Sequence, residues 1–137
     1  MDHPVLWQFT ASHFNEKARW ALDYKRVAHR RRSLLPGPHA LTVRRLTGQT
    51  AVPVLLLEGR AIHDSTRIIE ALERSYPDPP LYPRDAAERR RALELEDFFD
   101  EELGPHIRRL AFYHLLPHPD VVIAMFAQES GAAARAA

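Results

Sequence analysis

Three short segments of the sequence carry residue types from which a ligand site could be built. Ser12 precedes one amphipathic pattern, and the pair Asp64-Ser65 precedes another, so these residues stand where helix N-caps are expected. A serine hydroxyl at a helix N-terminus can donate a hydrogen bond to an anion, which the positive end of the helix dipole stabilises further. Between them, Val52-Pro53 opens an apolar run, and a cis peptide bond there would aim the Val52 backbone outward, toward a ligand.

Each of these residues also has a simpler structural interpretation. Pro53 would start an ordinary strand in the trans form, and Ser12 and Asp64 would only cap their helices. The histidines do not settle the question, because no spacing typical of a metal site is found among His3, His13, His63, His106, His114 and His118.

The composition limits the classes of protein that are possible. The chain has 137 residues with a net charge of +1, which argues against binding nucleic acid or anionic lipid through bulk charge. It contains no cysteine, which excludes disulfides, thiolate metal sites and redox chemistry by its own thiols. No apolar run approaches the ~20 residues that span a bilayer, and the first residues lack the features of a signal peptide. We therefore expect a cytoplasmic protein.

The first 76 residues predict an alternation of short strands and helices. Apolar and turn signals place strands over 5–9, 27–35, 52–57 and 61–63, and helical periodicity places helices over 12–24, 39–47 and 65–76. The arginines at positions 30–32 fall in the second strand, and charges of this kind suit the edge of a sheet. We expect Trp7, Trp20 and Tyr24 to lie in the core.

A proline-rich linker over residues 77–84 separates this part from a second, helical part over residues 85–137. Asp85 with Glu88 resembles a capping box, and Gly104-Pro105 is expected to interrupt or kink the long helix that follows. A last helix is expected to run past Glu129. Two or three helices do not close a bundle, so the apolar side chains Leu95, Phe99, Ile107 and Leu110 are expected to lack partners.

These segments resemble the glutathione S-transferase family. Val-Pro-Val-Leu, a tight hairpin and then Asp-Ser resemble the second half of its glutathione-binding domain. The stretch SHFNEKARWAL fits the pattern Ser-x-Phe-x-x-Lys-x-Arg-x-x-Leu, which is typical of the first helix of members with an active-site serine. The resemblance implies an α/β fold, with a thioredoxin-like N-terminal domain (β-α-β-α-β-β-α) over residues 1–76 and a partial all-α C-terminal domain over residues 85–137.

The resemblance also implies a set of roles at the site. Glutathione would be the co-substrate, with Val52 and Pro53 meeting its cysteinyl backbone and Asp64 and Ser65 its γ-glutamyl end. His39 would reach the glycyl carboxylate, although a surface position is an equal alternative. Ser12 would be the catalytic residue, because a hydroxyl that donates to a sulfur favours the thiolate of a thiol whose pKa is otherwise about 8.5.

The predicted function is therefore transfer of glutathione to small hydrophobic electrophiles, as in detoxification, by a homodimer that associates along the helices after Ser65 and Asp85. In the family the second domain builds most of the electrophile site, so we expect that site to be incomplete here. The alternatives are a non-catalytic interaction module of the same fold, or a fragment without the electrophile site. A nucleic-acid binder that uses Arg30–Arg32 and Arg89–Arg91 is a third reading, disfavoured by the near-neutral charge.

Overall fold

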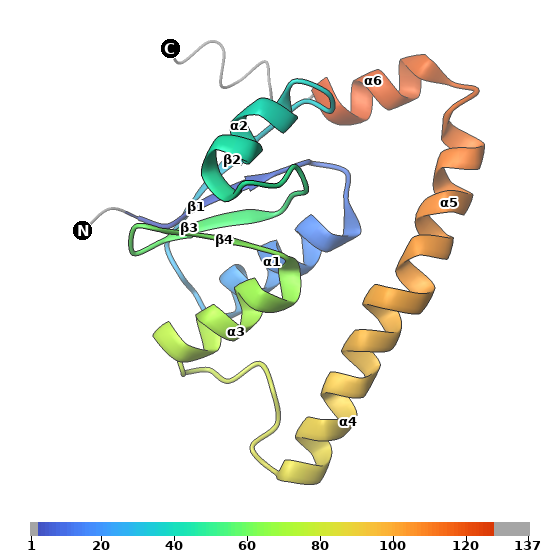
Figure 1. Cartoon of the computed structure of the whole chain (residues 1–137). Helices are drawn as coiled ribbons and strands as arrows, with labels where there is room; N and C mark the ends of the chain where they lie inside the picture. The colour runs from blue at the N-terminus through green and yellow to red at the C-terminus, as the bar shows by residue number, and fades with distance from the viewer. Residues whose placement is uncertain (1–2, 128–137) are drawn as a thin grey trace.

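A four-stranded sheet with helices on both faces forms the first part of the structure, a computed structural model that describes residues 3–127 (Figure 1). The elements are, in order, β1 (Val5–Gln8), α1 (His13–Tyr24), β2 (Arg30–Ser33), α2 (His39–Thr47), β3 (Val54–Leu57), β4 (Arg60–His63) and α3 (Ser65–Ser75). The strand order is β2-β1-β3-β4, in which β1 and β2 are parallel and the other neighbours antiparallel. The predicted thioredoxin-like arrangement is confirmed.

In each of the four strands, one end leads to candidate site residues. The register of the sheet places these four strand ends next to one another. Trp7 of β1 pairs with Val54 of β3, which in turn pairs with His63 of β4. In the parallel pair, Gln8 lies opposite Ser33. The loops that leave β1, β2 and β4 and the loop that enters β3 therefore lie at the same edge of the sheet.

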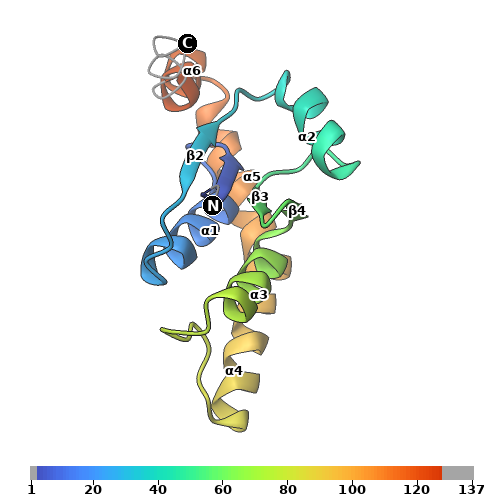
Figure 2. The ribbon, with the colours of Figure 1, turned by 90° about the vertical axis from the view of Figure 1, so that its left-hand side faces the viewer.

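The core lies between the sheet and the helices α1 and α3, and α2 covers the other face (Figures 1 and 2). The largest apolar side chains with no exposed surface are Leu6, Leu22, Leu55, Ile68 and Leu72. Each such side chain contributes about 1.5–3 kcal/mol by leaving water. Because α1 and α3 are held by this core, their N-termini are fixed at the sheet edge described above.

Two aromatic residues of α1 do not join the core, so their predicted burial is wrong. Trp20 is 70% exposed and Tyr24 is 55% exposed. Each lies two positions beyond a buried residue, Ala18 or Leu22, which places it about 200° away around a helix of 3.6 residues per turn. Trp7 is partly buried, and the Arg32 guanidinium lies over its ring at 5.3 Å.

The strand β2 forms an edge of the sheet, as its arginines predict, although it is shorter than expected. Arg31 donates two hydrogen bonds to the carboxylate of Asp23, at 2.8 and 2.7 Å. Arg31 and Arg32 of this strand therefore contact neighbouring side chains, Asp23 and Trp7, while remaining exposed.

After residue 85 the chain forms one long helix and a short return helix. The helix α4 (Ala86–Asp97) continues through the π-helical turn η1 (Phe98–Leu103) into α5 (Gly104–Leu115), and α6 (Pro119–Ala127) turns back toward the sheet (Figure 1). No helix within residues 3–127 is both long and apolar enough to cross a membrane. The last part of the helix predicted to run past Glu129 lies outside the described residues.

Gly104-Pro105 does not end the long helix; the winding changes to π-helical just before it. The Gly104 N–H donates to Phe99 O, five residues back, and Pro105 has no N–H to donate. The π turn thus shifts the hydrogen-bond register where proline would otherwise break it. A Cβ on Gly104 would lie 2.8 Å from Phe99 O and 3.1 Å from His13 Nε2, so glycine also permits the close approach of α5 to α1.

A polar cluster fixes the long helix against the thioredoxin-like part. Lys17 of α1 donates to Thr66 Oγ1 of α3 at 2.9 Å, lies 2.6 Å from Glu96 Oε1 and contacts the carboxylate of Asp100. Tyr82 donates its hydroxyl to Glu96 Oε2 at 2.5 Å. Burial, together with the bond to Glu96, raises the pKa of Tyr82 well above its ordinary value, so the phenol remains a donor.

The proline-rich segment is also held in place. The buried Lys25 donates to the carbonyls of Tyr76 at 2.6 Å and Pro79 at 2.9 Å, and lies 2.5 Å from Glu73 Oε1. Glu73 accepts in turn from the Leu81 N–H at 3.0 Å. One ion pair between α1 and α3 therefore determines the path of the chain between the two parts.

Candidate active site

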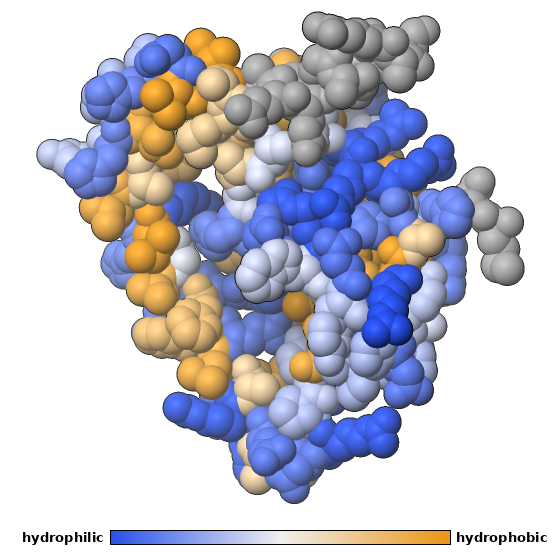
Figure 3. All heavy atoms as spheres, turned by 180° about the vertical axis from the view of Figure 1, so that it is seen from behind, coloured by the Kyte–Doolittle hydropathy of each residue, from blue (hydrophilic) through white to orange (hydrophobic). Residues whose placement is uncertain are grey.

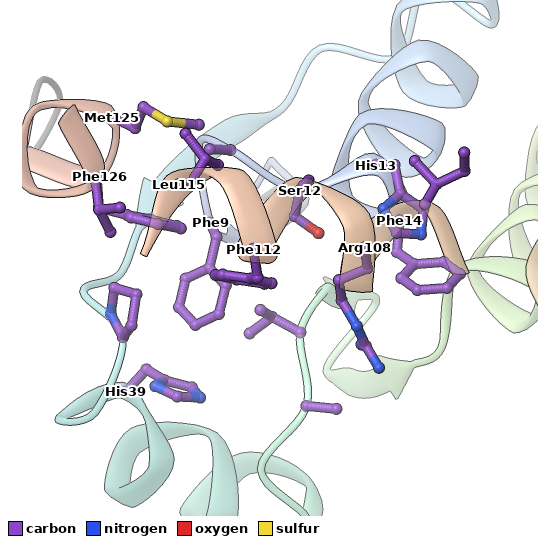
Figure 4. A pocket seen from close by; sticks show the side chains of 17 residues that line it. Phe9, Ser12, His13, Phe14, His39, Arg108, Phe112, Leu115, Met125 and Phe126 are labelled. Atoms are coloured by element: carbon purple, nitrogen blue, oxygen red, sulfur yellow. The ribbon is translucent and has the colours of Figure 1, made fainter. Parts of the chain in front are cut away.

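A cleft of about 700 Å³ lies between the sheet edge that carries Ser12 and the helices α5 and α6 (Figure 4). Three of the predicted site residues, Ser12, His39 and Val52, line it. Pro53, Asp64 and Ser65 do not. The structure thus brings together residues that are separated by 40 positions in the sequence, because the strand ends converge here.

Ser12 occupies the N-cap position of α1 without acting as a side-chain cap. Its backbone is extended, with φ −157° and ψ 127°, and its carbonyl accepts the Glu16 N–H at 2.9 Å. The hydroxyl makes no hydrogen bond to the first-turn amides of α1. In Figure 4 it points into the cleft, where a ligand would meet both the hydroxyl and the positive end of the helix dipole.

Arg19 supports the loop that places Ser12. It is buried, and its guanidinium donates to Gln8 Oε1 at 2.9 Å and to the carbonyls of Phe9 and Thr10 at 3.2 Å each. It also contacts the carboxylate of Glu16. The arginine in the Ser-x-Phe-x-x-Lys-x-Arg pattern is thus a positioning residue, and the Lys17 of the same pattern joins α1 to the long helix.

The Val52–Pro53 peptide bond is cis, as predicted, and Val52 lines the cleft beside Ala51. Pro53 is buried behind it at the start of β3. A second cis bond, Asp78–Pro79, was not foreseen in the proline-rich segment.

His39 reaches the cleft from the first turn of α2. Its ring packs edge-on against Phe9, with the centroids 4.7 Å apart, and Nδ1 accepts the Gly37 N–H at 3.0 Å. With Nδ1 an acceptor, the proton of the neutral ring lies on Nε2. This nitrogen is a hydrogen-bond donor for a ligand such as a carboxylate.

Asp64 caps α3, as predicted. Its Oδ1 accepts the N–H groups of Thr66 at 2.9 Å and Arg67 at 3.2 Å. The backbone of Asp64 has φ +75°, a region that non-glycine residues rarely adopt and that costs about 1–3 kcal/mol. Ser65 follows as a buried residue, whereas Asp64 is exposed. Strain of this kind clusters at ligand sites, so it favours a function for this helix end beyond capping.

The apolar wall that we expected to be incomplete is present in part. Side chains of α5 and α6 line the cleft, among them Ile107, Phe112, Leu115 and Phe126. The end of α6 is tied to the sheet edge, because Thr10 donates to Met125 O at 3.1 Å and the rings of Phe9 and Phe126 meet edge-on at 5.8 Å. The helices α5 and α6 thus supply part of the wall, and the incompleteness of the electrophile site stays a prediction.

Two residues that the sequence did not single out also line the cleft, His13 and Arg108. Burial lowers the pKa of the His13 imidazole, the positive charge of Arg108 lowers it further, and Asp100 acts in the opposite direction. His13 is therefore neutral near pH 7. Over residues 3–127, no group of three or more His, Asp or Glu side chains is arranged to hold a metal ion.

The sequence agrees with a known family over more than half of its length. Residues 6–80 match the family described as glutathione S-transferase, N-terminal domain. The protein therefore belongs to the glutathione S-transferase family.

Individual relatives extend the likeness into the helical part. Glutathione S-transferase U24 of Arabidopsis thaliana is 32% identical over 111 residues, which cover 80% of this chain and 51% of the relative. A Caenorhabditis elegans protein named "Probable maleylacetoacetate isomerase" is 32% identical over 91 residues, which cover 65% of this chain and 42% of that relative. The chain thus spans about half the length of these relatives.

A solved structure agrees with this assignment. A bacterial maleyl pyruvate isomerase, described as a glutathione S-transferase of the zeta class, superposes with a TM-score of 0.71 at 30% identity. The superposition covers 81% of this chain and 54% of that protein.

Proposed function

We propose that this protein binds reduced glutathione and promotes attack of its thiolate on small hydrophobic electrophiles. In that reaction the sulfur forms a bond to the electrophilic carbon, the leaving group departs with its electron pair, and the thiol proton passes to water. The observation that carries the proposal is the Ser12 hydroxyl, which is not used as a cap and points into an apolar cleft.

The hydroxyl would act on the sulfur without losing its own proton. A thiol with a pKa of about 8.5 is only a few per cent thiolate at neutral pH. A hydrogen bond from Ser12 and the N-terminus of α1 both favour the charged form, so they lower the thiol pKa. Neutral His13 does not compete for this role as a cation.

The remainder of glutathione would extend along the sheet edge. The Val52 backbone would meet the cysteinyl unit, while the N-terminus of α3 would receive the γ-glutamyl carboxylate at Ser65. The Asp64 carboxylate would face the α-ammonium group, and Nε2 of His39 would donate to the glycyl carboxylate. The convergence of the strand ends supports this placement, because the residues concerned lie at one edge.

The helical part would supply both the electrophile wall and an association surface. Some of its apolar side chains face the cleft, whereas Leu95, Phe99 and Leu110 do not line it and are 38–55% exposed. Hydrophobic side chains gather along this helix in Figure 3. An exposed stripe of this kind promotes association, which supports a homodimer.

Titration calorimetry with reduced glutathione tests the proposal directly, followed by conjugation of glutathione to a chlorinated dinitrobenzene. Binding together with conjugation above the uncatalysed rate is expected. Binding without conjugation would assign the chain to the non-catalytic alternative. A chain that binds no glutathione would overturn the proposal altogether.

A further inference from the structure

Arg108 is the one permanently charged side chain among the described residues that line the cleft. It projects from α5, and its neighbours in the lining are mostly aliphatic and aromatic (Figure 4). The other polar residues of the lining are Ser12, His13 and His39. None of the lining residues is a carboxylate.

The guanidinium of Arg108 has no hydrogen-bond or ion-pair partner within the described part of the chain. Asp100 is the acidic residue close enough to influence His13 beside it, but Asp100 is already engaged by Lys17 and Thr66. Arg31, by contrast, pairs with the carboxylate of Asp23. Among residues 3–127, no neighbouring carboxylate therefore neutralises the positive charge of Arg108 in the cleft.

An unpaired guanidinium in a largely apolar cleft has a clear preference among ligands. Its planar fork forms two parallel hydrogen bonds with a carboxylate, a geometry that lysine does not offer. Apolar walls reduce the local dielectric and increase the strength of such a pair. The side chain is exposed in the free protein, so water hydrates it until a ligand arrives.

We infer that Arg108 selects electrophiles that carry a carboxylate, whose apolar body packs against Phe112 and Ile107 while the acid group pairs with the guanidinium. This inference rests on the proposed function, because it names the class of co-substrate that the same site accepts. It makes Arg108 a specificity-determining residue rather than a group that activates the sulfur. The preferred co-substrates are therefore small electrophiles that carry a carboxylate.

Two electrophiles that differ only in the acid group test the inference. They are para-chloro-meta-nitrobenzoate and its carboxamide, each compared with its own uncatalysed rate. The wild-type chain is expected to favour the benzoate. Arg108→Gln should raise the KM for the benzoate about ten- to a hundred-fold, the effect of losing a charge-assisted pair, and leave the amide unchanged. Arg108→Lys should restore part of the preference.

Arg109→Gln is the matched control, because Arg109 is the adjacent residue on α5, is exposed and does not line the cleft. Arg109→Gln should leave the KM for both electrophiles unchanged. Calorimetry with reduced glutathione and the pH dependence of conjugation accompany each variant. Both readouts should be the same for Arg108→Gln and the wild type.

Three results would overturn the inference. If Arg108→Gln conjugated both electrophiles equally more slowly and raised the thiol pKa, Arg108 would act at the sulfur. A weakened affinity for glutathione would place it at a carboxylate of glutathione itself. Equal KM values for benzoate and amide in the wild type would show no selection by charge. A failure to conjugate either electrophile contradicts the proposed function instead, so the two failures are distinguishable.

Discussion

Lys17 Nζ on α1 lies 2.6 Å from Glu96 Oε1 on α4, and the same ammonium contacts Asp100 one turn further along the helix. All three side chains are largely buried, with exposures of 21%, 10% and 16%. A single cation therefore contacts two carboxylates at the point where the helical part meets the thioredoxin-like part. The cleft depends on this contact, because its far wall belongs to the same long helix.

Replacing Lys17 by methionine should destabilise the protein strongly. The two carboxylates would be left without their cation. Breaking an ion pair lowers the free energy of unfolding by about 3–5 kcal/mol when the pair is fully buried, and by about 1 kcal/mol or less when it is exposed. We expect a loss of about 1–3 kcal/mol in the free energy of unfolding, measured by urea denaturation. Arg91→Met is the control, since its contact with Glu94 is exposed and 3.9 Å long. Equal effects of the two substitutions would contradict the proposed role of Lys17.

Replacing Ser12 by alanine should lower the rate of conjugation but hardly change stability. The hydroxyl caps no amide of α1, so the free energy of unfolding should change by less than about 0.5 kcal/mol. Loss of the hydrogen bond to the thiolate, worth about 1.5–3 kcal/mol, should reduce the rate about ten- to a hundred-fold. The apparent thiol pKa from the pH–rate profile should rise toward that of free glutathione.

The opposite pattern would identify Ser12 as a cap only. In that case stability would fall by about 1 kcal/mol, and the rate would stay within a factor of two or so of the wild type.

Replacing Asp64 by asparagine should weaken glutathione binding without unfolding α3. Asparagine keeps an oxygen for the Thr66 and Arg67 amides and tolerates positive φ, but it lacks the charge that would face the α-ammonium group. The charge is remote from the sulfur and acts equally on the ground and transition states. Calorimetry should therefore show a higher Kd, with the rate at saturation unchanged.

Asp85→Asn is the matched control, because Asp85 caps α4 in the same way, through Ala87 and Glu88. A similar loss of affinity in both variants would indicate an indirect effect of capping.

The sequence predicts what is local in this structure. Spacing alone predicts α1 and α3, and the residue types at 64 and 85 predict the caps of α3 and α4. The residues that it fails to place depend on contacts between distant segments. Arg108 has no local signal for a cleft, and the fully buried Asn15, whose amide has no partner within residues 3–127, would be expected at a surface.

The exposed stripe on the long helix should drive self-association. Leu95 and Leu110 are 38% and 55% exposed, and neither lines the cleft. We expect sedimentation to show dimers in the wild type and monomers when both are replaced by glutamate. Leu41→Glu on α2, at a residue that is 60% exposed, should leave the dimer intact. A wild-type chain that remains monomeric at high concentration would contradict the proposed homodimer.

The pair of Lys25 and Glu73 should make stability depend on pH in the acidic range. Burial by itself would raise the pKa of the Glu73 carboxyl, but hydrogen bonds from Lys25 and from the Leu81 N–H outweigh it and lower the pKa below its ordinary value of 4.5. A carboxyl whose pKa is lower in the folded state stabilises the fold fully above the unfolded value. This stabilisation is lost as the pH falls through the folded pKa.

Urea denaturation of the wild type and Glu73→Gln between about pH 6 and pH 3 measures this contribution. Above pH 4.5 the variant should be less stable, because it leaves the buried Lys25 without its carboxylate. The difference should shrink as the pH falls, since protonation of Glu73 in the wild type removes the same charge. Glu94→Gln, in an exposed pair with Arg91, should show a small difference at every pH. A gap between wild type and Glu73→Gln that stays constant down to pH 3 would show that Glu73 acts through packing and not through its charge.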